Sequence, residues 1–533
     1  MANLLATKPL NLLMEEARET GDHSLKRTLG VFQLTALGVG AIIGAGIFVM
    51  VGLGAQYAGP GLSLSFVLSG LGCAFAGLCY AEFAAMIPLA GSAYTYAYAT
   101  LGELLAWIIG WDLTLEYAMG ASTVSSGWSN HFIELLNIVH IKMPLWLAYD
   151  HWTALKTAEN VVARQIAQAS DSSLVPGTQA FLDKVSAIIA AQSPELLQRA
   201  HELLGAPHLF GMEIGFNLPA FLIALVITAI LVVGIKESAR FNATIVVIKV
   251  SVVLFVIALG AHYINRANWG VDWHSYAPHG LSGIWQGAAY IFFAYIGFDA
   301  VSTTAQEAKN PQRDLPIGIL ASLFICTVLY MLISVVLLGM AYYPTMATVP
   351  NPVSFAVGKI ADLHWLVPII DVGASVGLAS TIFVGLYGQS RIFYSMSRDG
   401  FLPTMFAAVH SRFKTPYRGT LITGIAAAAI AAVFPLNLLG QLVSIGTLLA
   451  FVVVCAGVMI LRVQAPRARR PFRTPYVWLV APLGILFCGG MMRSLPDDTW
   501  LRLAIWTAIG ILIYFAYGVW HAQASKWKVT NES

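Results

Sequence analysis

The first long apolar run of the chain contains glycines at a depth where a spanning helix would normally continue. Gly44, Ala45 and Gly46 lie in the stretch GVGAIIGAGIF, and Gly38 and Gly40 precede them. Close helix packing through small residues explains part of this pattern. Glycines at mid-membrane also weaken the helix, and a broken helix offers N–H groups to a carboxylate and carbonyls to an ammonium. The pattern therefore predicts a site for a small zwitterion.

The sixth apolar run, GAAYIFFAYIGFDA, carries a similar interruption at Gly297. It also holds Asp299 and a cluster of aromatic residues at Phe292, Phe293 and Tyr295. Runs one and six occupy matching positions if the first ten runs form two repeats of five. Paired interruptions in corresponding segments are the best pointer in a sequence to the binding site of a transporter.

Lys249 lies in the middle of another apolar run, IVVIKVSVV. A charged side chain at that depth costs roughly 2.5–3.5 kcal/mol on membrane-insertion scales. Because burial disfavours the charged ammonium, proton exchange at this lysine is feasible, and we favour a role in proton coupling. A fixed cation that tethers the first and eighth helices is the alternative. Sodium is a rival, since Ser380 and Thr381 could supply hydroxyl ligands, although an ammonium nearby would repel it.

Glu82, Asp112, Glu116 and Asp299 are among the carboxylates that fall within or near apolar runs. Asp112 and Glu116 are four residues apart and share a helix face, so either could favour a cationic substrate side chain. For Glu116 this specificity role and a purely structural role are equally weighted. Glu82 and Asp299 lie near the predicted cytoplasmic ends of their runs, where water reaches them, and a structural role is favoured for both.

The composition requires that these residues sit in a membrane protein. Of the 533 residues, 58% are hydrophobic and 11% are charged, whereas soluble proteins have roughly 25% charged residues. A net charge of +3 is too small to suggest a nucleic-acid partner. The five cysteines fall inside apolar runs without the spacing of disulfides or metal sites, so we expect no metal and no cofactor.

Twelve apolar runs approach the roughly 20 residues that a spanning helix needs. They cover residues 31–54, 62–87, 104–131, 218–233, 243–261, 283–302, 315–340, 365–388, 420–434, 439–461, 476–492 and 501–520. The sequence therefore predicts an all-α integral membrane protein with twelve transmembrane helices.

Basic residues set the orientation of these helices. With the N-terminus in the cytoplasm, the short outer loops hold only Arg266, Lys359, Arg493 and Arg502, and the arginines and lysines of the other short loops lie inside. This asymmetry fits the positive-inside rule and predicts that both termini are cytoplasmic. The polar segment 138–212 then lies outside. Its apolar residues near helical spacing in 157–169, 178–191 and 194–204 predict short amphipathic helices, which we interpret as a passive cap, with partner binding as the alternative.

Several long motifs resemble the amino acid-polyamine-organocation superfamily, and within it bacterial permeases similar to cationic amino acid transporters. They are LKRTLGVFQLTALGVGAIIGAGIFV at 25–49, AYIGFDAVSTTAQEAKNPQRDLPIGI at 294–319, RIFYSMSRDGFLP at 391–403 and HSRFKTPYRG at 410–419. The resemblance covers nearly all of the membrane portion.

This resemblance implies an inverted five-plus-five repeat with discontinuous helices 1 and 6, followed by two extra helices. It also implies that Gly44, Ala45 and Gly46 hold the carboxylate of an amino acid substrate, and Ile43 is expected among the substrate-binding residues. The carbonyls of Ile42, Phe293 and Ile296 would hold its amine, and the Phe293 ring would gate the site. A lysine at position 249 is similar to that of relatives in which the amine replaces a sodium ion.

We therefore expect a secondary amino acid transporter, with protons as the coupling ion and cationic or small neutral amino acids as substrates. An exchanger, a sodium-coupled carrier, a polyamine carrier and a membrane amino acid sensor are the alternatives. An enzyme is disfavoured, since His201-Glu202 lacks the second histidine of a zinc motif. The expected regions are a cytoplasmic segment 1–30, a transporter core 31–461, helices 11 and 12 in 462–520 and a cytoplasmic tail 521–533. The expected location is the plasma membrane, the inner membrane of a bacterium.

Overall fold

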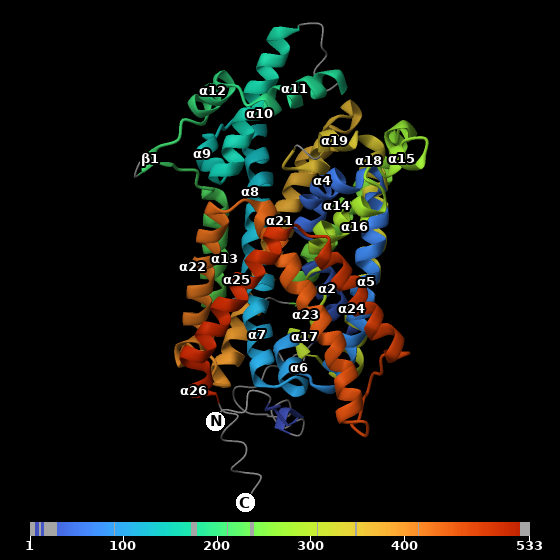
Figure 1. Cartoon of the computed structure of the whole chain (residues 1–533), viewed down its shortest axis with the longest axis vertical. Helices are drawn as coiled ribbons and strands as arrows, with labels where there is room; N and C mark the ends of the chain where they lie inside the picture. The colour runs from blue at the N-terminus through green and yellow to red at the C-terminus, as the bar shows by residue number, and fades with distance from the viewer. Residues whose placement is uncertain are drawn as a thin grey trace, which may run out of the picture.

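The computed structural model describes residues 6–9, 12–14, 29–89, 91–171, 179–209, 212–234, 239–305, 308–346, 349–413 and 415–522. Most of the predicted segment 1–30 and of the tail 521–533 lies outside these ranges. Long helices run side by side along the vertical axis of Figure 1, with α10–α12 at one end and α6 and α26 at the other.

Within the ranges that the structure describes, eight stretches of helix are long and apolar enough to cross a membrane. They are Val31–Phe48, Met50–Met86, Thr244–Tyr263, Trp273–Thr303, Pro311–Met340, Leu366–Arg398, Leu436–Gln464 and Asp497–His521. Three shorter apolar helices are α13 (Leu218–Val233), α22 (Tyr417–Val433) and α24 (Val477–Arg493). A further helix runs from α7 (Glu103–Thr114) through a π turn, η2 (Leu115–Met119), into α8 (Gly120–Ile138). The chain is therefore an all-α multi-pass membrane protein, and the count of twelve spans and the inverted repeat stay predictions.

The first predicted run is interrupted where its glycines cluster. Helix α2 (Val31–Ile42) ends before Ile43, and the chain re-enters helix in α3 (Ala45–Phe48) and α4 (Met50–Ala58). The sixth run is interrupted as well. Helix α16 (Gly280–Ile291) tightens into a 3₁₀ turn, η5 (Phe292–Tyr295), and helix resumes in α17 (Ala300–Thr303). Both interruptions lie where the glycine pattern predicted them.

The remaining helices surround these two interrupted segments. Helix α18 (Pro311–Met340) packs against α2 and against α5 (Leu62–Met86), whereas α14 (Ala239–Gly260) packs between α2 and α21 (Leu366–Arg398). Helix α21 also lies along α8. The other elements are α6 (Ser92–Thr100), α15 (Trp273–Tyr276), α19 (Tyr343–Met346), α20 (Pro352–Gly358), α23 (Leu436–Gln464), α25 (Asp497–Ile513), α26 (Val519–His521), and the short turns η1 (Gly59–Gly61), η3 (Ala261–Tyr263), η4 (Arg266–Trp269), η7 (Ala361–Leu363), η8 (Thr404–Ala407) and η9 (Tyr514–Gly518).

The polar segment after α8 folds into its own small unit. Its elements are α9 (Leu145–Ala148), α10 (His151–Ser170), α11 (Gln179–Ala191), α12 (Pro194–Leu204), and the two-residue strands β1 (His208–Leu209) and β2 (Met212–Glu213), which pair antiparallel. Asp150 and Ser193 cap α10 and α12 by accepting backbone N–H groups. Phe181 and Leu196 contribute to a separate apolar core. The three helices predicted in this segment are confirmed, and its role as a cap stays a prediction.

Candidate functional site

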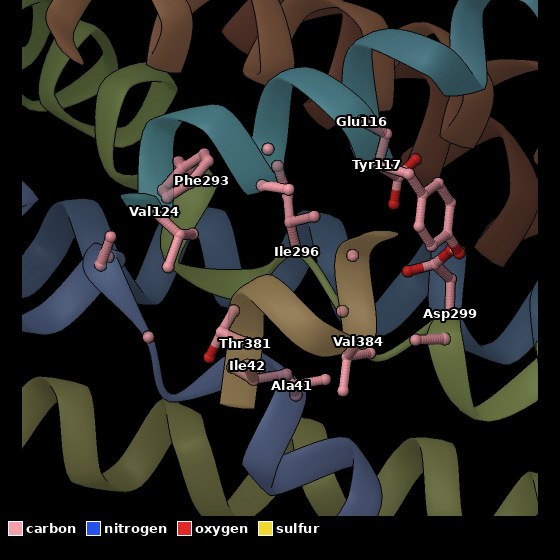
Figure 2. Close-up of a pocket in the computed structure, with 18 residues that line it drawn as sticks. Ala41, Ile42, Glu116, Tyr117, Val124, Phe293, Ile296, Asp299, Thr381 and Val384 are labelled. Atoms are coloured by element: carbon pink, nitrogen blue, oxygen red, sulfur yellow. The ribbon is translucent and has the colours of Figure 1, made fainter. Parts of the chain in front are cut away.

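The two interrupted segments face one another across a buried cavity. Its volume is about 50 Å³, which holds a few non-hydrogen atoms, since one buried water needs roughly 10–15 Å³ by the same measure. Figure 2 shows Phe293 and Val124 at one end of this cavity, and Glu116, Tyr117 and Asp299 at the other. Helices α2, α3, α8, α17 and α21, with the turns η2 and η5, contribute the walls.

Most of the predicted site residues line this cavity. They are Ile42, Gly44, Ala45, Gly46, Glu116, Phe293 and Ile296. Ile43 and Lys249 do not line it and lie directly behind the break in the first run. The structure therefore brings the predicted residues together, although their roles in binding stay predictions.

Glycine is required at the point where the two breaks touch. A Cβ on Gly46 would collide with the Cα and Cβ atoms of Ala294 in η5. Gly297 has a φ of +119°, which side chains other than glycine rarely adopt, and a Cβ there would lie 2.9 Å from the carbonyl carbon of Ala41. The glycines thus let two non-helical segments approach closely enough to form one site.

The broken ends supply both halves of a zwitterion site. The N–H groups of Ala45 and Gly46 open α3 and have no acceptor in a preceding turn of that helix. On the other side, the C-terminal end of α2 presents the Ile42 carbonyl. Tyr330 of α18 donates from one hydroxyl to the Ile42 carbonyl at 2.8 Å and to the Ala294 carbonyl at 3.0 Å. This tyrosine ties the two breaks together, and nothing in the sequence pattern distinguished it from other aromatic residues in the run.

Lys249 is fully buried, and its ammonium binds the same break from behind. Its Nζ donates to the carbonyls of Gly40 at 2.7 Å and Ile43 at 3.0 Å, and to the Thr381 hydroxyl at 3.2 Å. Its aliphatic stem passes Gly377, where a Cβ would lie 2.9 Å from the lysine Cγ. The ammonium therefore bridges helices α2 and α21 with two carbonyls and a hydroxyl, oxygen ligands of the kind that a small cation would use.

The prediction that Asp299 lies near water was wrong. Asp299 is fully buried and lines the cavity, although a position near water was expected. One of its carboxylate oxygens accepts from the Tyr117 hydroxyl at 2.6 Å and from the Ser92 hydroxyl at 3.4 Å. Its other oxygen and both oxygens of Glu116 have no hydrogen-bond partner among the described residues. One end of the cavity thus carries two carboxylates with unused acceptor capacity.

Asp112 and Glu82 are buried away from the cavity. Asp112, one helical turn before Glu116, is 2% exposed and also lacks a hydrogen-bond partner among the described residues. Glu82 was expected near water, but it is buried and accepts from Arg462 at 2.7 and 2.8 Å, from Arg470 at 3.1 Å and from the Thr474 backbone at 2.8 Å. This ion-pair cluster joins α5 to the last turn of α23 and to the segment that follows it, which supports the structural role predicted for Glu82.

The part of the chain that the structure describes contains no group of three or more His, Cys, Asp or Glu side chains suited to a metal ion. All five cysteines are buried and unpaired. The ligands of the cavity are therefore backbone groups, hydroxyls and carboxylates.

Comparison with known proteins gives consistent matches along the whole chain. Residues 29–516 match the family model described as amino acid permease. A methylthioribose transporter of Bacillus subtilis is 41% identical over 527 residues, which cover 99% of this chain and 100% of that protein. The branched-chain amino acid permease BcaP of the same organism is 42% identical over 510 residues, or 96% and 97% of the two chains. The vacuolar cationic amino acid transporter 4 of Arabidopsis thaliana is 35% identical over 84% of this chain and 65% of its own length.

Proposed function

The chain belongs to the amino acid permease family, and from that premise we propose that it is a secondary transporter that takes up amino acids with protons. The substrate's carboxylate binds the N–H groups at Gly44, Ala45 and Gly46, beside Ile43. Its ammonium binds the carbonyls of Ile42, Phe293 and Ile296. The opposed broken ends support this arrangement, because they present N–H groups and carbonyls to one small cavity.

The observation that carries proton coupling is the position of the Lys249 ammonium. It contacts the Gly40 and Ile43 carbonyls and the Thr381 hydroxyl, which a coupling cation would otherwise bind. Loss of its proton removes the charge that holds α2 to α21, so the first broken helix is released. Sodium coupling is less compatible with this geometry, since Thr381 is already occupied by the ammonium and a second cation would be repelled.

Transport proceeds by alternating access, in which the segments around the two breaks move against the rest of the bundle. In this scheme twelve helices span the membrane, the core 31–461 holds the inverted repeat, and 462–520 adds two helices. The Phe293 ring closes one end of the cavity and acts as a gate. The plasma membrane, with both termini in the cytoplasm, is the proposed location.

Cationic and small neutral amino acids are the proposed substrates. The backbone groups recognise the α-ammonium and α-carboxylate of either class. Glu116 and Asp299, which have carboxylate oxygens without partners among the described residues, favour a side chain that ends in an ammonium or guanidinium. The relatives carry names that span cationic amino acids, branched-chain amino acids and methylthioribose, so the substrate panel must include all three classes.

A second candidate, transport of methylthioribose, follows from the relative that matches 99% of the chain. A thio-sugar has no ammonium or carboxylate for the broken helix ends, so the amino acid proposal is preferred. Competition by excess methylthioribose against labelled amino acid would separate the two candidates.

The test is uptake of labelled arginine, lysine, alanine and leucine into proteoliposomes under an inward proton gradient, with and without sodium. Wild-type protein is compared with Lys249→Met and with a matched control, Lys359→Met, which removes a lysine in the loop after α20. We expect sodium-independent, gradient-driven uptake that only Lys249→Met abolishes. Stimulation by internal amino acid alone would indicate an exchanger, a sodium requirement would indicate a sodium carrier, and binding without flux would indicate a sensor.

A further inference from the structure

A histidine and an aspartate meet in the interior of the bundle, far along α8 toward the end that carries α10–α12. His131 Nδ1 lies 2.7 Å from Asp371 Oδ1, and both side chains are fully buried. The Ser354 hydroxyl donates to the same carboxylate oxygen at 2.6 Å. His131 Nε2 and Asp371 Oδ2 have no hydrogen-bond partner among the described residues. Three separate elements, α8, α20 and α21, therefore converge on one fully buried, ionisable pair.

The proton count of this pair sets its net charge. With one shared proton the His131–Asp371 pair is neutral overall, as imidazole with carboxylic acid or as imidazolium with carboxylate. Without that proton it carries one negative charge in a site closed to water. An isolated buried charge is strongly unfavourable, so the closed site requires the proton, whereas a hydrated site tolerates its loss.

The pair is connected to the first broken segment. The edge of its imidazole meets the Phe48 ring of α3, with centroids 6.0 Å apart and planes at 89°. Ser354 belongs to α20, and the α19–α20 segment packs directly on α4, where a Cβ on Gly52 would lie 2.5 Å from the Met346 carbonyl oxygen and 3.3 Å from the Pro352 Cβ. Movement of α3 and α4 must therefore disturb the site that holds His131 and Asp371.

Three other charged groups lie on or against the helices that hold the pair. Glu134 is one turn beyond His131 on α8 and is partly buried. Lys359, at the end of α20, lies over the Phe355 ring at 4.7 Å and donates to the Thr345 hydroxyl at 3.3 Å. Lys249 packs against Gly377, six residues along α21 from Asp371.

We propose that His131, Asp371 and Ser354 form a proton-binding clasp that holds α20 closed over α4, as a second protonation site separate from Lys249. The clasp rests on the alternating-access motion of the proposed function, though not on proton coupling at Lys249. Removal of the proton leaves a buried negative charge, water enters, and α20 lifts. Closure is therefore favoured at low pH and lost as pH rises. One proton changes the closed-to-open ratio by at most about tenfold per pH unit.

The test is the labelling rate of a single cysteine under the clasp by a membrane-impermeant maleimide. Ala356→Cys in α20 is fully buried, and Ala361→Cys, five residues on, is an exposed control for the intrinsic pH dependence of thiol labelling. The five native cysteines, which are buried and unpaired, are first replaced with alanine, and this protein serves as wild type in the assay. Both reporters are introduced into it, into the double variant His131→Gln with Asp371→Asn, and into Ser125→Ala. The serine control removes one buried hydroxyl of α8, which donates to the Ala121 carbonyl of the same helix at 2.8 Å.

The ratio of labelling at the buried reporter to that at the exposed reporter should rise as the pH is raised, in wild type and in Ser125→Ala. It should be independent of pH in the double variant, which keeps amide groups but has no proton to lose. A labelling ratio that does not change with pH in wild type overturns the clasp. A labelling ratio that still rises with pH in a monodisperse double variant overturns it too. Lys249→Met, carrying the same two cysteine reporters and no change in the clasp, should keep the rise of the labelling ratio with pH. If it loses this rise, Lys249 is the group that senses pH, and the clasp is overturned even if proton-driven uptake stands.

Discussion

Replacing Glu116 with glutamine tests whether the acidic end of the cavity recognises a cationic side chain. Glu116 is 3% exposed, lines the cavity, and has no hydrogen-bond partner for either oxygen among the described residues. A substrate ammonium or guanidinium placed there would donate a buried, charge-assisted hydrogen bond to a carboxyl oxygen of Glu116. Such bonds contribute about 1.5–3 kcal/mol, which corresponds to a change in affinity of about 10- to 150-fold.

The assay is the KM for arginine and for alanine, measured in proteoliposomes under the same proton gradient. Glu116→Gln should raise the arginine KM within this range and leave the alanine KM close to wild type, since the alanine methyl group is too short to reach the carboxylate. Asp112→Asn is the matched control, because Asp112 lies one turn earlier on the same helix, is equally buried and also lacks a partner among the described residues. It does not line the cavity.

Equal increases in the KM of arginine and alanine would refute this reasoning, because the effect would then lie at the shared α-groups or in the fold. An increase for arginine in Asp112→Asn as large as that in Glu116→Gln would refute it too. If wild-type protein does not transport arginine at all, Glu116 has no cationic substrate to recognise, and the specificity role is rejected.

Two further substitutions test the packing that builds the site. Gly46→Ala should raise the KM of every substrate by about 5- to 150-fold, because its methyl group collides with Ala294 and overpacking costs about 1–3 kcal/mol. The control is Gly489→Ala, whose added methyl group meets nothing within 4 Å and should leave KM unchanged in the same uptake assay. Glu82→Gln should destabilise the protein by about 3–5 kcal/mol, because Arg470 loses its buried counter-charge, and a thermal-unfolding assay in detergent would detect this as a large fall in Tm. The exposed pair of Glu195 and Arg199 offers the control, since Glu195→Gln should leave Tm unchanged. An unaltered KM in Gly46→Ala, or an unaltered Tm in Glu82→Gln, would contradict the corresponding contact.

The breaks were predictable from the sequence because they depend on local chemistry. Glycines at 44 and 46 and at 297 weaken a helix wherever they occur in an apolar run, and the structure interrupts both runs there. Lys249 was equally conspicuous, because a lone ammonium in an apolar segment needs oxygen partners. Which oxygens it binds could not be deduced, since Gly40 and Ile43 lie 209 and 206 residues from Lys249 in the chain, and Thr381 lies 132 residues from it.

Asp299 and Tyr330 show the limits of such reasoning. Counting residues from the end of a regular helix placed Asp299 near water, but the left-handed turn at Gly297 changes the direction of the chain and carries the carboxylate into the cavity. Tyr330 was overlooked because its role depends on two carbonyls that only the tertiary fold brings within reach of one hydroxyl. Long-range geometry, not residue type, decides both cases.

The most direct test of proton coupling through Lys249 is substrate-driven proton entry into sodium-free proteoliposomes that contain a trapped pH dye, with the membrane potential clamped and no initial pH gradient. Addition of external amino acid should acidify the interior of vesicles with wild-type protein or Lys359→Met, and should leave that of Lys249→Met vesicles unchanged. Amino acid entry without acidification in wild type, or acidification that persists in Lys249→Met, would contradict the assignment of the coupling proton to this lysine.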